Sequence, residues 1–100
     1  MNEETVLEVN EVKDGLIAQY GPYLRREDIA EIWDTSTASL GNTMRRSKEP
    51  GVVFLRRSRI RLGRRSRYPA ENVAKAIVLG DDELERQLRD LEKEGSTHEE

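Results

Sequence analysis

The sequence contains no cysteine and only one histidine, and these scarcities exclude most covalent and metal chemistry. Without thiols, neither disulfides nor thiolate metal sites can form. The single histidine, His98, lies in a polar stretch near the C-terminus and cannot build a metal site alone. No nucleophile–base pair, metal cluster or phosphate-binding loop is visible in the sequence. We therefore predict a protein that is not an enzyme, with no catalytic residue, no metal, no cofactor and no small-molecule substrate.

Long apolar runs are also missing from the chain. No run approaches the roughly 20 residues that span a bilayer, and the N-terminus lacks the charged-then-apolar pattern of a signal peptide. Hydrophobic residues make up 35% of the 100 residues and charged residues 37%, which leaves material for one modest core. We expect one small soluble cytoplasmic domain with loose ends and no membrane partner.

What the chain has in excess is positive charge in one stretch. Residues 44–68 hold ten basic residues and one acid, Glu49, whereas the whole chain has a net charge of −3. The flanks are acidic, because residues 1–43 carry nine acids against three bases and residues 69–100 carry ten against four. This separation predicts that the basic stretch meets a polyanion while the flanks keep the remainder soluble. The ten basic residues are Arg45, Arg46, Lys48, Arg56, Arg57, Arg59, Arg61, Arg64, Arg65 and Arg67.

Apolar residues recur at helical spacing near the N-terminus and predict a helix over residues 5–20. Thr5 is a suitable cap at its start, and the Gly-Pro pair at 21–22 ends it. Gly15 weakens the middle by about 1 kcal/mol relative to alanine. We favour packing of the apolar face on the same domain over a role in dimerisation. That face consists of Val6, Val9, Val12, Leu16, Ile17 and Tyr20.

Two short helices are expected next, over residues 26–33 and 37–47, with a polar break between them. Ser36 or Thr35 is a good N-cap for the second helix. The arrangement fits a helix-turn-helix. The first of the two takes its apolar face from Ile29, Ala30, Ile32 and Trp33.

The second of these helices has an inner and an outer side. Leu40 and Met44 lie one turn apart and should face inward. Gly41 is unusual at a helix centre, and it either allows close packing or simply lowers the stability of the helix. The outer side is polar and basic, with Ser39, Asn42, Arg45 and Arg46.

The remainder of the basic stretch predicts β-structure. Residues 52–55 form a short apolar run that suits a strand. Apolar and basic residues alternate over 58–62, and Gly63 opens a turn from which Arg67 and Tyr68 return. We therefore expect a basic β-hairpin. Trp33 and Tyr68 are expected in the core rather than as base-stacking surfaces.

Two helices are predicted after the hairpin. Pro69 suits the first turn of one that Gly80 terminates, with Val73, Ala74, Ile77 and Val78 on its apolar face. The other covers residues 81–94 and carries a stripe of Leu84, Leu88 and Leu91. This stripe packs on the domain or on a second copy, or the segment is not stably helical, and we rate self-association slightly ahead. Residues 95–100 are expected to form a disordered tail.

Three stretches together carry a resemblance to a known family: Tyr23–Ile32, Ser36–Arg46 and Arg59–Pro69. Their order resembles the winged helix-turn-helix of the MerR and phage or plasmid excisionase-like families, over about residues 22–79. The resemblance implies an α+β, mostly α fold: a winged helix-turn-helix with a basic β-hairpin wing and flanking N- and C-terminal helices. The implied organisation is an N-terminal helix at 1–20, the DNA-binding domain at 21–80, and a C-terminal amphipathic helix with its tail at 81–100.

The resemblance and the arginines together predict binding to double-stranded DNA. Asparagine pairs with adenine and arginine with guanine in the major groove, while arginine also neutralises phosphates. For each single arginine, the alternative to DNA binding is a contact within the protein. For Ser36 and Asn42, the alternative is a structural role. The predicted DNA-binding residues are Ser36, Thr37, Ser39, Asn42, Thr43, Arg45, Arg46, Arg56, Arg57, Arg59, Arg61, Arg64, Arg65 and Arg67.

The expected function is a small transcriptional regulator or an excisionase-like accessory factor in recombination, associated with the nucleoid. A homodimer through residues 5–20, residues 81–94 or both is a further expectation. An RNA-binding or ribosome-associated protein is the first alternative, since an arginine-rich hairpin also suits RNA. With five aromatic residues in the chain, however, single-strand stacking platforms are scarce. The second alternative is an antitoxin-like protein-interaction module that uses the acidic helices.

Overall fold

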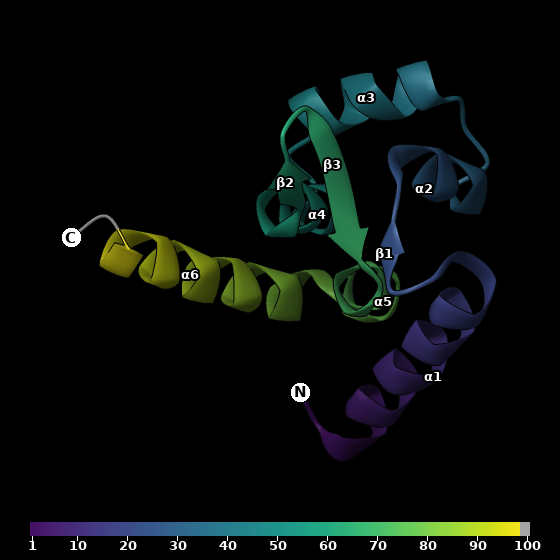
Figure 1. Ribbon diagram of the computed structural model, residues 1–100. Coiled ribbons are helices and arrows are strands. Elements are labelled where there is room, and N and C mark those ends of the chain that lie inside the picture. The colour runs from purple at the N-terminus through teal and green to yellow at the C-terminus, as the bar shows by residue number, and fades with distance from the viewer. Residues whose placement is uncertain (99–100) are drawn as a thin grey trace.

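The computed structural model describes residues 1–98, and within them the chain forms six helices and one small antiparallel sheet of three strands (Figure 1). This confirms the expectation of a mostly helical α+β protein. In chain order the elements are α1 (Glu3–Tyr20), β1 (Tyr23–Leu24), α2 (Arg26–Ile32), α3 (Thr37–Arg46), α4 (Pro50–Ser58), β2 (Ile60–Leu62), β3 (Arg65–Pro69), α5 (Ala70–Val78) and α6 (Asp81–His98).

Helix α5 is the centre of the core. Its residues Val73 and Ala74 are fully buried, because α1 packs along one side of α5 and α4 along another. Helix α6 then packs on α4, so α1 and α6 extend to different sides of the centre (Figure 1). The apolar face of α5 is narrower than the sequence suggested. Ile77, which we expected on it, is 44% exposed, so that prediction is wrong.

Helix α1 packs on its own domain, as the favoured interpretation predicted. Val9 and Leu16 are buried, while Val6 and Ile17 lie at the edge of the contact and stay exposed. The helix begins at Glu3 instead of Thr5, because Asn2 is the N-cap and its side chain accepts a hydrogen bond from the Thr5 N–H at 2.8 Å. Asparagine is among the best N-cap residues, and here it lies three residues before the threonine that we had favoured.

Replacing Gly15 with alanine is expected to raise the free energy of unfolding by about 0.5–1 kcal/mol, because glycine inside a helix is less favourable than alanine. Gly15 lies exposed in α1, and a β-carbon there would meet no atom within 4 Å. Urea denaturation followed by circular dichroism measures the change. Gly63→Ala is the control, since its φ of 65° should make alanine destabilising by about 1 kcal/mol. A loss of stability in Gly15→Ala would contradict the finding that Gly15 lies on the solvent-exposed side of α1.

The sheet has the strand order β1-β3-β2 and places the hairpin on the domain. The predicted hairpin is confirmed: β2 and β3 pair antiparallel with Ile60 opposite Arg67, and the turn between them contains Gly63. Strand β1 was not predicted, because a two-residue strand has no readable periodicity. It pairs with β3 so that Leu24 lies opposite Tyr68, and both side chains are fully buried.

Residues 52–55 form part of a helix, so the predicted strand is wrong. Helix α4 begins at Pro50, whose fixed φ and missing N–H suit the first helical position, and it buries Phe54 and Leu55. A run of four apolar residues does not distinguish a strand from a buried helical segment. The proline ahead of the run was the local signal for a helix start.

The C-terminal helix α6 is longer than expected. It continues from Asp81 to His98, so residues 95–98 are helical and not part of a disordered tail; residues 99–100 lie outside the described part. Gly95 is tolerated inside the helix and does not end it. Leu84 is buried, and Leu88 and Leu91 are partly buried against the same core. The leucine stripe therefore packs on its own domain, which was the alternative that we had rated slightly lower.

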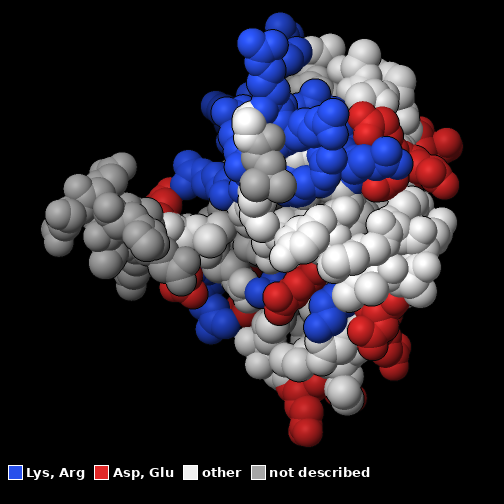
Figure 2. Space-filling model, in the orientation of Figure 1, with Lys and Arg blue, Asp and Glu red and all other residues white. Residues whose placement is uncertain are grey.

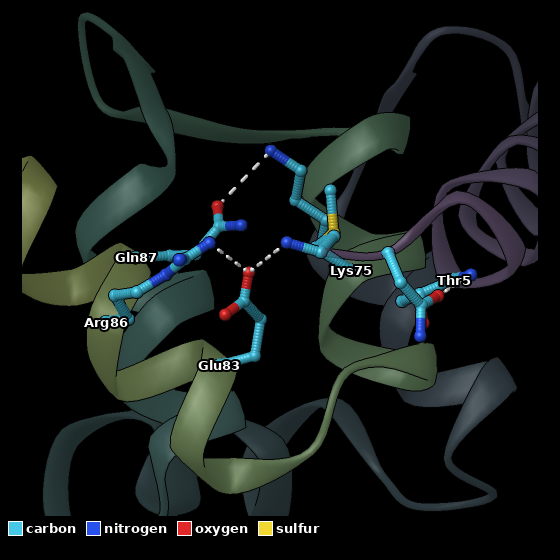
Figure 3. Close-up of polar contacts among 7 residues, drawn as sticks. Thr5, Lys75, Glu83, Arg86 and Gln87 are labelled. Carbon is cyan, nitrogen blue, oxygen red and sulfur yellow. Dashed lines mark hydrogen bonds and ion pairs between the residues drawn. The ribbon is translucent and has the colours of Figure 1, made fainter.

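Polar contacts near the start of α6 tie it to α5 and to the N-terminal residue (Figure 3). Glu83 accepts hydrogen bonds from the α-amino group of Met1 at 3.2 Å and from Arg86 at 2.7 Å, and Lys75 donates to Gln87 at 3.4 Å. Desolvation acts to raise the pKa of Glu83, but hydrogen bonds from Met1 and Gln87 and the charge of Arg86 outweigh it, so the pKa lies below its ordinary value. Stability that depends on this carboxylate is therefore lost as the pH falls through the lowered pKa.

Candidate nucleic-acid interface

The turn between α2 and α3 fixes the direction of α3. Asp34 adopts a left-handed conformation with φ 51°, and the Thr35 N–H donates to the Ala30 carbonyl at 2.9 Å, which closes the end of α2. Aspartate is one of the few residues besides glycine that visits this conformation readily. Ser36 is the N-cap of α3, as predicted, and its hydroxyl oxygen accepts from the Ser39 N–H at 3.1 Å. Ser36 therefore has a structural role in the helix start.

Helix α3 buries one side and exposes the other. Leu40 and Met44 are buried, which confirms the predicted inner face. On the outer face Asn42 accepts a hydrogen bond from Arg45 through its side-chain oxygen, at 2.6 Å. This contact orients the guanidinium and leaves the Asn42 amide nitrogen and a second oxygen lone pair for a ligand. The exposed residues of α3 on the predicted list are Thr37, Ser39, Asn42, Thr43, Arg45 and Arg46.

The hairpin presents its arginines close to α2 and α3. Arg64 and Arg65 are exposed at the turn, and the half-buried Arg67 donates to the Ser66 carbonyl at 3.0 Å. Between the hairpin and the two helix starts lies a groove of about 460 Å³. We call it the arginine groove. Its lining residues are Arg25, Arg26, Glu27, Thr37, Arg64, Arg65, Ser66 and Arg67.

Two arginines of this groove, Arg25 and Arg26, were missing from the sequence-based list of site residues. Arg25 directly precedes α2 and Arg26 is its first residue. Both lie in a region that we had counted as acidic. The adjacent pair of arginines at the start of the helix-turn-helix region was the available signal. The fold brings them to the hairpin because β1, directly before them, pairs with β3.

Arg26 also lies against α3. A β-carbon built on Gly41 would be 3.8 Å from Nη1 of Arg26, so the guanidinium is next to the α3 backbone at this point. Gly41 is buried, but 3.8 Å from the end of a flexible side chain is an ordinary van der Waals distance, so the β-carbon of an alanine would fit there. The contact with Arg26 therefore does not require a glycine at this position.

Besides Arg45 and Arg67, two more of the predicted arginines form contacts within the chain. Arg56 is half-buried and donates from Nη1 to the Met44 carbonyl at 2.8 Å, so it caps the C-terminal end of α3. Arg57 forms an ion pair with Glu92 of α6. Among residues with described side chains, Arg57 is the one member of the ten basic residues in 44–68 that pairs with a carboxylate. Most of the excess positive charge is therefore not neutralised inside the molecule.

The basic residues gather on one side of the molecule. Figure 2 shows Lys and Arg concentrated over α3 and the hairpin, with acidic groups beside α2 and over the lower part of the molecule. Arg61 and Lys48 are exposed, and Arg59 is half-buried, in the segments that lead into and through the hairpin. We use the term basic surface for the outer face of α3, the arginine groove and the hairpin.

A second hollow, of about 620 Å³, lies where α2, α3, α4 and the α5–α6 junction meet. Leu40, Met44 and Leu84 contribute its apolar lining, and Trp33 borders it.

Trp33 is 43% exposed, so its predicted place in the core is wrong, whereas the prediction for Tyr68 is confirmed by its complete burial. Trp33 is the C-cap residue directly after α2, whereas Ile29, one turn earlier, is fully buried.

No protein-family model matches the chain, and neither a curated protein nor a solved structure matches it significantly. The interpretation of the basic surface therefore depends on its own chemistry. No helix within residues 1–98 combines the length and the apolar composition that a bilayer crossing requires.

Proposed function

We propose that this protein binds double-stranded DNA as a winged helix-turn-helix, with α3 in the major groove and the β2–β3 hairpin as the wing beside it. The observation that supports the proposal most is the basic surface itself. It joins a polar, outward helix face to a group of arginines that are largely free of carboxylate partners in the described part of the chain. In the cell the protein would act as a small transcriptional regulator or an excisionase-like recombination factor.

The dimensions of α3 suit the major groove. A helix of ten residues is about 15 Å long and, with side chains, about 10–12 Å across, while the major groove is about 12 Å wide. Ser39 and Asn42 on the exposed face offer hydrogen bonds that can distinguish base edges, and Arg45 suits guanine. Ser36 serves as the cap, so its part in the interface is to hold the first turn of α3 in place.

The charges suit the DNA backbone. Duplex DNA presents one negative charge per about 1.7 Å of axis, and each phosphate neutralised by arginine or lysine releases counterions. Arginine binds phosphate through two parallel N–H bonds. The nine basic residues of 44–68 other than Arg57 have no carboxylate partner among the described side chains, and Arg56 among them is engaged by backbone carbonyls.

Fluorescence anisotropy with matched 20-mers of duplex DNA, single-stranded DNA and RNA, across a range of salt concentrations, tests the proposal. Duplex DNA should bind most tightly, and the plot of log K against log salt concentration should have a slope of about −4 or steeper if five phosphates are contacted. Tighter binding of RNA or of single strands would favour the RNA-binding alternative. Binding of none of the three would refute nucleic-acid recognition.

Replacing Asn42 with alanine is expected to reduce the preference for a selected DNA site by about tenfold while changing affinity for random duplex much less. A good side-chain contact to a base edge contributes about 1–3 kcal/mol of discrimination, and the substitution also releases Arg45 from its partner. Affinity for both duplexes, measured at one salt concentration, gives the ratio. Asn10→Ala, an exposed asparagine of α1, is the matched control. Equal losses on both duplexes would show that Asn42 does not read bases.

A further inference from the structure

We propose that the arginine groove holds one phosphate of the DNA backbone, with Arg26 as its principal ligand from the helical side and Arg65 from the hairpin side. This inference rests on the proposed function and adds a contact point that sequence reasoning did not assign. It gives α2 a part in binding, because Arg26 is the first residue of that helix.

The groove concentrates positive charge from two distant segments. Five arginines line it, two from the start of α2 and three from the hairpin about forty residues later, against one carboxylate, Glu27. Carboxylates close to an arginine cluster can neutralise it, so the partners of Glu27 decide whether the groove stays cationic.

Arg25 compensates the acids of α2. Its guanidinium lies 3.9 Å from Glu27 and 3.5 Å from Asp28, and its backbone N–H donates to the Asp28 carboxylate at 2.9 Å. Asp28 is buried, so this arrangement belongs to the start of α2. Both acids next to the groove therefore pair with Arg25, and the one net negative charge that remains is outweighed by the other four arginines of the groove. Arg26, Arg64 and Arg65 have no carboxylate partner among the described side chains.

Arg26 is exposed at the start of α2, and its side chain extends to α3. Its guanidinium lies next to the α3 backbone at Gly41, and the same groove includes Thr37 in the first turn of α3. A phosphate bound here would touch α2, α3 and the hairpin together. It would set how far α3 reaches into the major groove, so that base contacts and backbone contacts depend on the same alignment.

Arg26→Gln tests the assignment, with Arg89→Gln on α6 as the control of equal charge change. Because the electrostatic part of the binding constant scales as salt concentration to the power −0.9 per contact, we expect about fivefold weaker duplex binding at 0.15 M salt. The salt slope should decrease in magnitude by about 1. Arg26→Lys should recover part of the loss, since lysine keeps the charge but not the planar fork. Thermal melting verifies that the variants are folded.

The outcomes separate this inference from the proposed function. If the wild type binds duplex and Arg26→Gln behaves like Arg89→Gln, the phosphate site is refuted while DNA binding stands. If the wild type binds no duplex, both fail. A titration with inorganic pyrophosphate tests whether the groove binds a free phosphate compound instead of the DNA backbone. The NMR chemical shifts of the Thr37 and Ser66 backbone amides report the binding. Saturation by pyrophosphate that Arg26→Gln abolishes, combined with unchanged DNA binding, would overturn the assignment to the DNA backbone.

Discussion

Replacing Arg64 and Arg65 together with alanine is expected to weaken binding to every duplex about 30-fold at 0.15 M salt and about 200-fold at 0.05 M salt, if each contacts one phosphate. The salt slope should decrease in magnitude by about 2, because two counterion-releasing contacts are lost. Both side chains are exposed at the hairpin turn, and both line the arginine groove. Anisotropy titrations with random and selected duplexes at several salt concentrations measure both quantities.

The control for this experiment is Arg86→Ala with Arg89→Ala on α6, which removes the same charge elsewhere. Arg86 pairs with Glu83 on the surface, a contact that contributes little to stability. If the α6 double variant lost as much affinity as the hairpin variant, the effect would come from net charge and not from the wing. Unchanged affinity in the hairpin variant would remove the hairpin from the interface.

Replacing Leu84 with alanine is expected to lower the free energy of unfolding by about 2–4 kcal/mol, the usual cost of a buried leucine. Leu84 is 2% exposed, and its Cδ1 would lie 3.8 Å from a β-carbon on Gly51, so it fills the contact between α4 and α6. Urea denaturation at two protein concentrations measures the loss. Because the contact is within one chain, the loss should be the same at both concentrations.

Leu7→Ala is the matched control for Leu84→Ala. Leu7 is 59% exposed on α1, so its truncation should change stability by less than about 0.5 kcal/mol. A loss in Leu84→Ala that grows on dilution would instead place the leucine stripe in a dimer interface. Leu84→Met, which keeps the volume of the side chain, should retain most of the stability and excludes a purely local helix effect.

Sequence reasoning succeeded where the local signals all favoured the same structure. The extent of α3 was predicted to within one residue, because the Ser36 cap and the spacing of Leu40 and Met44 favour the same helix. The hairpin was predicted because apolar and basic residues alternate over 58–62 and Gly63 opens a turn after them. In both places the local pattern and the tertiary contacts favour the same structure.

Sequence reasoning failed where a local signal was ambiguous or where tertiary contacts decided. The apolar run at 52–55 was ambiguous between strand and helix, and the helix start at Pro50 was not recognised. Strand β1 exists through its pairing with β3, which no local pattern records. Among the arginines, the sequence could not separate Arg56, which caps α3, from neighbours that remain exposed. Nor could it bring Arg26 into the site, because this requires the hairpin to return beside α2.

An acidic protein can approach DNA because its opposite charges are separated in space. Helices α1 and α6 contain twelve of the twenty acids, and both extend away from α3 (Figure 1). At 0.15 M salt the Debye length is about 8 Å, which is shorter than every dimension of the 34 × 33 × 23 Å molecule. A phosphate in contact with the basic surface therefore experiences mainly that surface. At 0.01 M salt, where screening extends to about 30 Å, the distant carboxylates would repel the duplex during encounter, and the molecule would approach as an oriented dipole.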